Sequence, residues 1–267
     1  MVCPTYRILI LAMRDRGTNG IGSLEKGVDL LFLFVGSSTL GVREIAERLD
    51  VPVSTAYRFV RTFRHKGLLE QDPVTRKYQL GLRLLALEAP ILRPLDVRRI
   101  ALPHMETLAQ HCQETVQLTL RRAFQGVIIE VVESPEPLRV APARGQSVPL
   151  HSGALAKAIL AFLPKAEIDR YLASGPLHRF TPDTITDPMH LGKELARIRK
   201  RGYAVSRQEV VLGAGGVAAP VFDSTGQVIA SVGVSAPLHR LTAAKIADIV
   251  PEVLRHAEKM SVELGRR

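Results

Sequence analysis

Four cations lie close together in residues 51–67, whose sequence is VPVSTAYRFVRTFRHKG. They are Arg58, Arg61, Arg64 and Lys66, and the same stretch contains no carboxylate. Lys and Arg side chains at this density favour a polyanionic partner, because they can neutralise phosphates. An ordinary solvent-exposed helix face is the alternative. Which reading holds depends on the elements that position these side chains.

The apolar residues of this stretch have helical spacing. Ala56, Phe59, Val60 and Phe63 lie at i, i+3, i+4 and i+7, which predicts a helix with one face in a core. Ser54 is the expected N-cap. The remaining faces are cationic and rich in hydrogen-bond donors, and carry Thr55, Tyr57, Arg58, Arg61, Thr62, Arg64 and His65.

A second amphipathic helix is predicted just upstream, in the sequence GVREIAERL. Its apolar residues repeat the same spacing, and Glu44 and Arg48 form an i,i+4 pair on the solvent side. Only residues 50–53 separate the two predicted helices. Two short amphipathic helices with so short a connection predict a helix-turn-helix, whose second helix enters the DNA major groove.

The flanking segments extend this motif to a winged helix-turn-helix. A helix from the Ser23 cap to about Val35 precedes it. Downstream, GLLEQDPVTRKYQLG predicts a helix stop at Gly67, a short strand, an Asp72-Pro73 turn and a second strand over 76–80. Arg76 and Lys77 lie near the tip of this predicted wing, where they could reach phosphate.

Length and composition limit the class of protein. With 267 residues, the chain is expected to divide into two domains, and 46% hydrophobic and 23% charged residues exclude a disordered or membrane-embedded chain. The apolar run over 8–13 is too short to span a bilayer, and we read no signal peptide there. Cys3 and Cys112 are the only cysteines, so a cytoplasmic location is expected. The net charge of +10 favours a polyanion without naming one.

The rest of the chain predicts a linker and a second domain. A leucine-rich helical pattern interrupted by Pro90 and Pro94 predicts a linker helix over 81–95. From Asp96 a helix runs towards Cys112 and two strands follow; helices dominate 152–201, and three strands and a final helix from about Thr242 close the chain. Because strands and helices are segregated, the predicted class is α+β with an antiparallel sheet.

Several residues in this second domain could have carried catalysis or metal binding. His151 beside Ser152 suggests a hydrolase, but the sequence has no G-x-S-x-G elbow and no acid at a recognisable spacing. Glu130 and Glu133 are expected on opposite sides of a strand, so they make a poor acid/base pair. His104, His111 and Cys112 lack the ligands that would complete a metal site. GAGG at 213–216 is only weakly similar to a phosphate-binding turn, and a flexible loop explains it equally well. We expect no enzyme, metal or cofactor.

The sequence resembles the IclR family of bacterial transcriptional regulators. The resemblance runs from about Ser23 to the C-terminus, through SLEKGVDLL, REIAERLDVPVSTAYRFVRTF, KGLLEQDPVTRKYQLG, VPLHSGALAKAILAFLP, ITDPMHLGKELARIRKRGYAVS and VAAPVFDSTGQVIASVGVSAP. It implies an N-terminal extension over 1–22, a winged helix-turn-helix over 23–80, the linker over 81–95 and a GAF-like effector-binding and oligomerisation domain over 96–267. The implied partners are double-stranded DNA with a palindromic operator, a small-molecule effector, and further copies of the chain in a homodimer or homotetramer. A membrane is not an implied partner.

Specific site residues are also expected. Those on the DNA side follow from the geometry of a recognition helix, whose N-terminal half enters the groove deepest, and those of the effector pocket follow from the resemblance. Ser54, Thr55, Tyr57 and Arg58 are expected to face the groove, with Arg58 the best candidate for a base contact, and Arg61, Thr62, Arg64, Arg76 and Lys77 complete the predicted DNA surface. The effector pocket is expected to be framed by Gly153, Ala154, Ser206, Gly216, Gly233 and Ser235. Main-chain N–H groups near Gly153 and the Ser235 hydroxyl could hold a carboxylate.

The pocket departs from the pattern of the resembled family. Gly216 stands where a cysteine is common, Gly233 where a serine is common, and Ser206 where an acid is common. We therefore expect a roomier, less polar pocket and a bulkier ligand, such as an aromatic or long-chain organic acid. Arg207 is either a cationic clamp for that acid or a solvent-exposed side chain.

The predicted function is effector-controlled, sequence-specific DNA binding in transcription, as repressor or activator. One alternative is a small-molecule enzyme domain tethered to a nucleic-acid-binding domain, and another is a structural DNA-bridging protein. Oligomerisation through Leu82, Leu84, Leu85 and Leu87 is expected, although these leucines could also pack within one chain.

Overall fold

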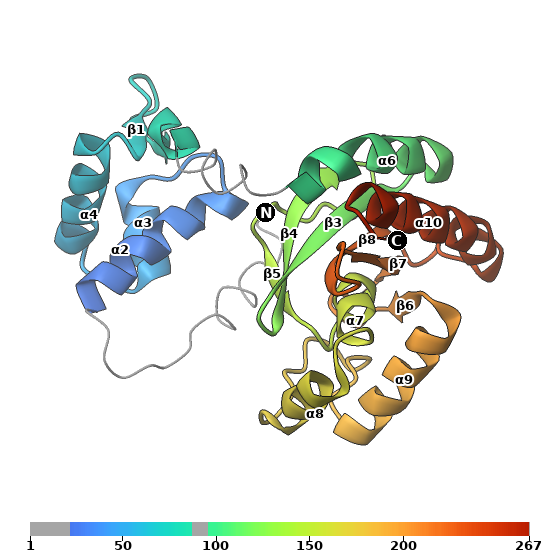
Figure 1. Cartoon of the computed structure of the whole chain (residues 1–267). Helices are drawn as coiled ribbons and strands as arrows, with labels where there is room; N and C mark the ends of the chain where they lie inside the picture. The colour runs from blue at the N-terminus through green and yellow to red at the C-terminus, as the bar shows by residue number, and fades with distance from the viewer. Residues whose placement is uncertain (1–21, 87–95, 267) are drawn as a thin grey trace. The chain divides into compact units, whose positions relative to one another are not determined.

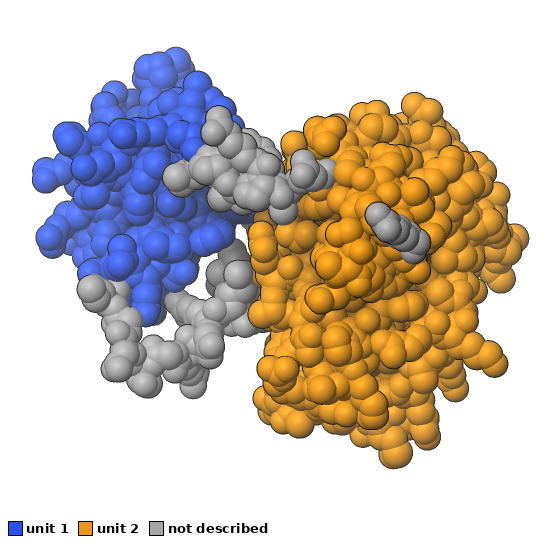
Figure 2. All heavy atoms as spheres, viewed as in Figure 1, with its two compact units in different colours: residues 1–94 blue, residues 95–267 orange. Residues whose placement is uncertain are grey.

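The computed structural model describes residues 22–86 and 96–266. The chain forms two compact units, Met1–Pro94 and Leu95–Arg267 (Figure 2). Each unit has its own hydrophobic core. No helix within the described residues combines the length and apolar character needed to cross a membrane.

The first unit contains the winged helix-turn-helix that the periodicity predicted. Its elements are α2 (Gly22–Phe32), the 3-10 helix η1 (Leu33–Gly36), α3 (Val42–Leu49), α4 (Val53–His65), β1 (Leu69–Gln71) and β2 (Tyr78–Leu80). The two strands pair antiparallel, with Leu69 opposite Leu80, and Leu40 adds an isolated bridge to Tyr78. The apolar stripes of the three helices meet in one core, which includes Leu30, Ile45, Leu49, Ala56, Val60, Leu69 and Tyr78.

Three local predictions in this unit are wrong. Ser54 does not cap α4: the helix starts at Val53, because the Pro52 carbonyl already accepts N–H groups from Thr55 and Ala56 at 2.9 and 3.1 Å. Ser23 lies inside α2. The second strand of the wing starts at Tyr78, since Arg76 has a left-handed φ of 59° that belongs to the turn.

The predicted linker falls largely outside the described residues. Leu82–Leu84 form the 3-10 helix η2, and residues 87–95, with Pro90 and Pro94, lie beyond the described range. Of the predicted N-terminal extension, only Gly22 is described, as the first residue of α2.

The second unit is an antiparallel α+β domain, as predicted. Its six-stranded sheet has the order β5-β4-β3-β8-β7-β6, and every neighbouring pair is antiparallel. The strands are β3 (Thr115–Arg122), β4 (Gln125–Val132), β5 (Ser147–Pro149), β6 (Ala204–Arg207), β7 (Ala214–Phe222) and β8 (Val228–Pro237). β5 was not predicted, because three residues are too few to show a period.

Helices cover both faces of this sheet (Figure 1). One face packs on α6 (Asp96–Cys112) and α10 (Ala243–Glu263), and the other on α7 (Ala154–Leu160), α8 (Lys165–Ala173) and α9 (Pro188–Arg201). Alternate residues of one strand enter the two cores: Val217 and Ala219 pack with α6 and α10, whereas Ala218 packs with α7 and α9.

Candidate functional site

The two helices of the helix-turn-helix are held in a fixed relationship by their connection. Asp50 ends α3 in a left-handed conformation with φ of 54°, and its N–H and that of Val51 bond back into the helix. At the other end of α3, the Glu44 carboxylate accepts the Gly41 N–H at 2.7 Å, which lowers the pKa of Glu44. The short turn and the shared core therefore fix which face of α4 is exposed.

The exposed face of α4 carries most of the predicted DNA-binding side chains. Tyr57 is 54% exposed, Ser54, Arg58, Arg61, Thr62 and Arg64 are also exposed, and Thr55 is half-buried. Arg58 and Arg61 form no ion pair with any carboxylate of the described residues. Their charges are thus available to an external polyanion.

Two of the other predicted cations, Arg64 and Lys77, have side-chain partners inside the unit. Arg64 donates to the Gln71 side chain of β1 at 3.4 Å, and Lys77 lies 3.4 Å from Glu44 of α3. The Thr62 hydroxyl donates to the Arg58 carbonyl at 2.9 Å, so its proton stabilises the helix. Arg58 and Arg61 are consequently the cations of α4 with the fewest competing contacts.

The second unit encloses a cavity of about 120 Å³ on the α7 side of the sheet. Of the six predicted effector residues, all but Gly233 line it. Ala154 comes from the start of α7, Ser206 and Gly216 from paired positions of β6 and β7, and Ser235 from β8. The structure therefore brings together residues that are far apart in the sequence.

The expected enlargement of this pocket is not supported by the geometry of the two glycines. A Cβ atom on Gly233 would lie 2.5 Å from the Val217 carbonyl oxygen and 2.6 Å from the Ala218 Cβ, and one on Gly216 would lie 2.7 Å from the Val234 carbonyl oxygen. Both glycines therefore allow neighbouring strands to approach closely and leave no open space. Arg207 is exposed and does not line the cavity, so it is no clamp.

Amide and hydroxyl groups supply hydrogen-bond donors in the cavity. The Gln117 amide donates to the Ser235 hydroxyl oxygen at 2.7 Å, which leaves the Ser235 proton to donate elsewhere. The Gln146 side-chain oxygen accepts the Ala143 N–H at 3.2 Å, so its NH₂ group keeps its donors. Gln117 and Gln146 were not predicted: Gln117 lies within an alternating strand and Gln146 in a loop, and neither position gives a signal of its own.

A buried ion pair between Lys157 and Glu209 forms part of the cavity wall. Lys157 has a side chain only 1% exposed and Glu209 one 7% exposed, and Glu209 lines the cavity. The Lys157 ammonium also donates to the Val205 carbonyl at 3.3 Å. Burial raises the pKa of Glu209, although the nearby Lys157 charge opposes that effect.

Glu209 also changes the expected role of Gly153. The Gly153 N–H donates to Glu209 at 3.2 Å, so a carboxylate of the protein already occupies the main-chain donor expected to hold the effector. The sequence contained a signal for this pair: Lys157 interrupts the apolar run ALAKAILAF, and a buried lysine needs a partner.

The catalytic and metal-binding alternatives find no supporting geometry. His151 is buried, hydrogen-bonded through its ring to the Tyr171 hydroxyl at 2.8 Å and to the His178 carbonyl at 2.9 Å, and burial lowers its pKa. The Ser152 hydroxyl instead faces the Pro149 carbonyl at 3.4 Å. Across residues 22–86 and 96–266, no group of three or more His, Cys, Asp or Glu side chains could hold a metal.

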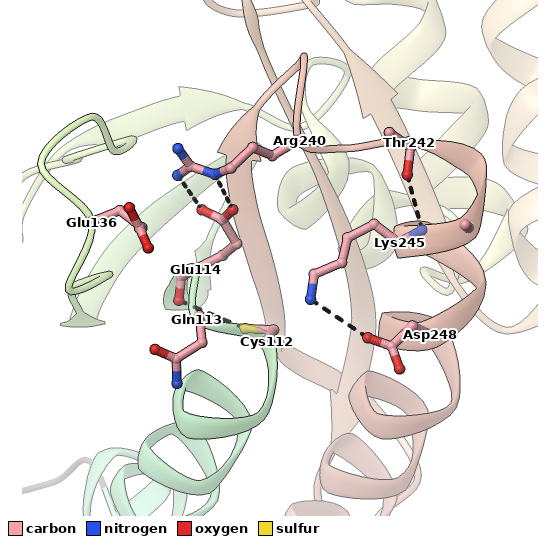
Figure 3. Close-up of a pocket in the computed structure, with 9 residues that line it drawn as sticks. Cys112, Gln113, Glu114, Glu136, Arg240, Thr242, Lys245 and Asp248 are labelled. Carbon is pink, nitrogen blue, oxygen red and sulfur yellow. Dashed lines mark hydrogen bonds and ion pairs between the residues drawn. The ribbon is translucent and has the colours of Figure 1, made fainter.

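A second, more open cavity of about 530 Å³ lies between the end of α6 and the start of α10. Four of its five charged side chains pair with one another (Figure 3): Arg240 contacts Glu114 with two nitrogens, and Lys245 lies 3.5 Å from Asp248. Cys112 is buried beside it, and burial raises the pKa of its thiol. Because these groups satisfy each other, the smaller cavity is the better candidate site.

Comparisons with known proteins identify the family of both units. The family model "Bacterial transcriptional regulator IclR C-terminal" matches residues 89–262, and "IclR helix-turn-helix domain" matches residues 23–73. The HTH-type transcriptional regulator BhcR of Paracoccus denitrificans is 31% identical over 99% of this chain and 94% of its own length.

Solved structures show the same architecture. The IclR protein of Thermotoga maritima is 34% identical and superposes with a TM-score of 0.77, covering 92% of this chain and 100% of its own. An IclR homologue from Microbacterium hydrocarbonoxydans, crystallised with 4-hydroxybenzoate, is 28% identical with a TM-score of 0.74, covering 91% of this chain and 98% of its own.

Proposed function

The chain belongs to the IclR family of helix-turn-helix transcriptional regulators with a C-terminal effector-binding domain, and we propose that a small organic acid in its cavity controls binding to a specific DNA operator. The observation that carries this proposal is that one chain combines an exposed cationic α4 with a donor-lined cavity. Its relatives are named as regulators, and the family is not enzymatic. Action in the cytoplasm, where operator DNA lies, is part of the proposal.

On the DNA side, α4 is proposed to lie in the major groove. Arg58 is the proposed base-reading residue, because it is exposed in the N-terminal half of the helix and forms no ion pair with a described residue. Ser54, Thr55 and Tyr57 flank it, while Arg61, Arg64, Arg76 and Lys77 are proposed to contact phosphates. Thr62 has the weakest support, since its hydroxyl bonds the helix itself.

On the effector side, the cavity favours a compact acid. A cavity of about 120 Å³ is comparable with cavities of about 150 Å³ that hold one benzene molecule. The Ser235 hydroxyl and the Gln146 amide can donate to carboxylate oxygens. The bound 4-hydroxybenzoate of the Microbacterium homologue supports the same ligand class. A single ring or a short chain fits this volume.

Self-association completes the proposal. One recognition helix reads only a few base pairs, so a dimer or tetramer on a palindromic operator is needed for useful specificity. Apolar side chains remain exposed along α2, where Leu24, Val28 and Phe32 are 63%, 44% and 48% exposed and share one helix face. They offer a surface on which two copies of the chain could pair. Self-association would be contradicted if light scattering showed only monomers at concentrations that saturate DNA.

The function is tested by selecting operator sequences from a randomised DNA pool and measuring their affinity with and without an acid. We expect enrichment of one palindromic motif. Calorimetry should show binding of benzoate or 4-hydroxybenzoate to the protein, and the same acid should shift DNA affinity and be recovered unchanged. Chemical conversion of the acid would favour an enzyme, and DNA affinity indifferent to every acid that binds would favour a bridging protein.

A further inference from the structure

The loop over residues 139–146 touches both faces of the sheet in the second unit. Val140, Pro142 and Gln146 line the cavity on the α7 side. Arg144, in the same loop, instead reaches the Glu130 carboxylate of β4, to which its Nε donates at 2.6 Å. A movement of this loop at the cavity would therefore also move a cation that contacts the opposite face.

Glu130 lies on that opposite face because of a β-bulge. Thr119 pairs with Ile128 and Leu118 pairs with Glu130, so Ile129 is the additional residue of β4. Ile128 thus faces the cavity together with Thr119, whereas Glu130 faces α6 together with Leu118. Ile128 and Glu130 are two residues apart, so in a regular strand without the bulge both side chains would point to the same face of the sheet.

Glu130 also contacts the first turn of α6. Its side chain is 1% exposed, and its second carboxylate oxygen lies 2.6 Å from Arg98 Nε. Neither of these two buried atoms has a hydrogen-bond partner among the described residues, so the contact is an ion pair without hydrogen-bond geometry. Arg98 and Arg144 thus contact the two oxygens of one buried carboxylate, so the position of Glu130 depends on both cations.

We propose that the chain Arg144–Glu130–Arg98 transmits occupancy of the cavity to the start of α6. A ligand that displaces the loop moves Arg144, and Glu130 then re-orients. The contact of Glu130 with Arg98, in the first turn of α6, changes as a result. This turn begins at Asp96, directly after the boundary between the two units at residues 94 and 95, so it is the part of the effector-binding unit closest in sequence to the DNA-binding unit.

This inference rests on the proposed effector function of the cavity, and it names the residues that relay the effect. Arg144 and Arg98 are positioning residues, since neither lines the cavity. Arg139 offers a matched control: it lies in the same loop but pairs with Glu133, whose side chain is 58% exposed, with Nε donating at 2.9 Å.

The first measurement needs no ligand. Amide hydrogen exchange of the full chain is compared for the wild type, Arg144→Ala and Arg139→Ala. Arg144 has a side chain 58% exposed, so its removal should leave the fold intact. Exchange in the first turns of α6 should become roughly three- to tenfold faster in Arg144→Ala, and stay unchanged in Arg139→Ala. Unchanged exchange in Arg144→Ala would overturn the relay.

The second measurement uses 4-hydroxybenzoate and the selected operator DNA. The shift in DNA affinity caused by the acid should be lost in Arg144→Ala and kept in Arg139→Ala, while calorimetry shows that both variants still bind the acid. An equal shift in Arg144→Ala and the wild type would overturn the relay. If the acid does not bind the wild type, the proposed ligand class fails, and the exchange measurement still decides the relay.

Discussion

The Lys157 ammonium on α7 contacts the Glu209 carboxylate that follows β6, and both side chains are almost fully buried. Glu209 in turn accepts the Gly153 N–H at the start of α7. This pair therefore joins α7 to the segment after β6 at the wall of the cavity. Such a pair does not by itself stabilise a fold, because desolvation of both charges offsets their attraction.

We predict that removing one charge of this pair lowers the free energy of unfolding more than replacing both charged residues by neutral ones. Lys157→Met leaves a buried carboxylate without its cation and should lower the free energy of unfolding by about 3–5 kcal/mol. The double variant Lys157→Met/Glu209→Gln keeps an oxygen for the Gly153 N–H and should lose less than Lys157→Met alone. Urea unfolding measures both values.

The exposed pair Lys165–Asp169 is the control for this prediction. Both of its side chains are more than half exposed, so Lys165→Met should change stability by less than about 1 kcal/mol. A double variant as unstable as the sum of its two single variants would show that Lys157 and Glu209 do not depend on each other.

The DNA surface makes a prediction about two neighbouring cations. Arg58→Ala should weaken operator binding by about 1–3 kcal/mol and relax preference at one or two base positions. Arg61→Ala should weaken operator and random DNA alike and lower the slope of log affinity against log salt by about one. Fluorescence anisotropy over a salt series separates the two effects. Unaltered affinity and preference in Arg58→Ala would contradict the proposed docking of α4.

Gly233 makes a prediction about packing where the sequence indicated a ligand contact. A Cβ at this position would overlap the Ala218 Cβ and the Val217 carbonyl. Gly233→Ala should therefore lower the free energy of unfolding by about 1–3 kcal/mol. In Gly192→Ala of α9, the new Cβ would meet only the Leu172 Cδ1 at 4.0 Å, so stability should be equal or up to about 1 kcal/mol higher. Thermal unfolding compares them, and equal Tm values would contradict close strand packing at Gly233.

His256 of α10 makes a prediction about pH. Arg255 donates to its Nε2 at 3.2 Å, so His256 carries its proton on Nδ1 and donates to His104 Nδ1 at 3.2 Å, while His104 Nε2 donates to Glu263 at 2.9 Å. Burial, with the charges of Arg255, His104 and Lys259, lowers the pKa of His256 to about 4, against the opposing effect of Glu252. The neutral ring is therefore the one that the fold accommodates.

The direction of the pH effect follows from this shift. The unfolded chain takes up the His256 proton near its ordinary pKa of 6.5, whereas the folded chain does so only at about 4. The stability contributed by the neutral ring is thus fully present above pH 6.5 and is lost as pH falls to about 4, by the order of 2–3 kcal/mol. His256→Gln should show a shallower fall in Tm over this range than the wild type. His111→Gln, at a 41% exposed site of α6, should follow the wild type, and identical curves for all three proteins would refute the assignment.

The sequence by itself determined most of the elements of both units, β5 excepted, and the fold class of each unit. Apolar periodicity of 3.6 placed α3 and α4 within two residues of their observed bounds, and the segregation of strands and helices predicted the antiparallel sheet. It also indicated which α4 side chains are exposed, because a helix with one apolar stripe leaves its other faces to solvent. These features depend on neighbours along the chain, which a sequence displays directly.

Only the tertiary structure decided what occupies each position around the cavity. That Glu209 takes the Gly153 N–H, that Gly216 and Gly233 face main chain, and that a bulge at Ile129 turns Glu130 towards α6 all depend on segments tens of residues apart. The start of α4 at Val53 likewise depends on which carbonyl accepts the first N–H groups. Residue types limit such contacts, but strand register and packing select among them, and neither is encoded in local spacing.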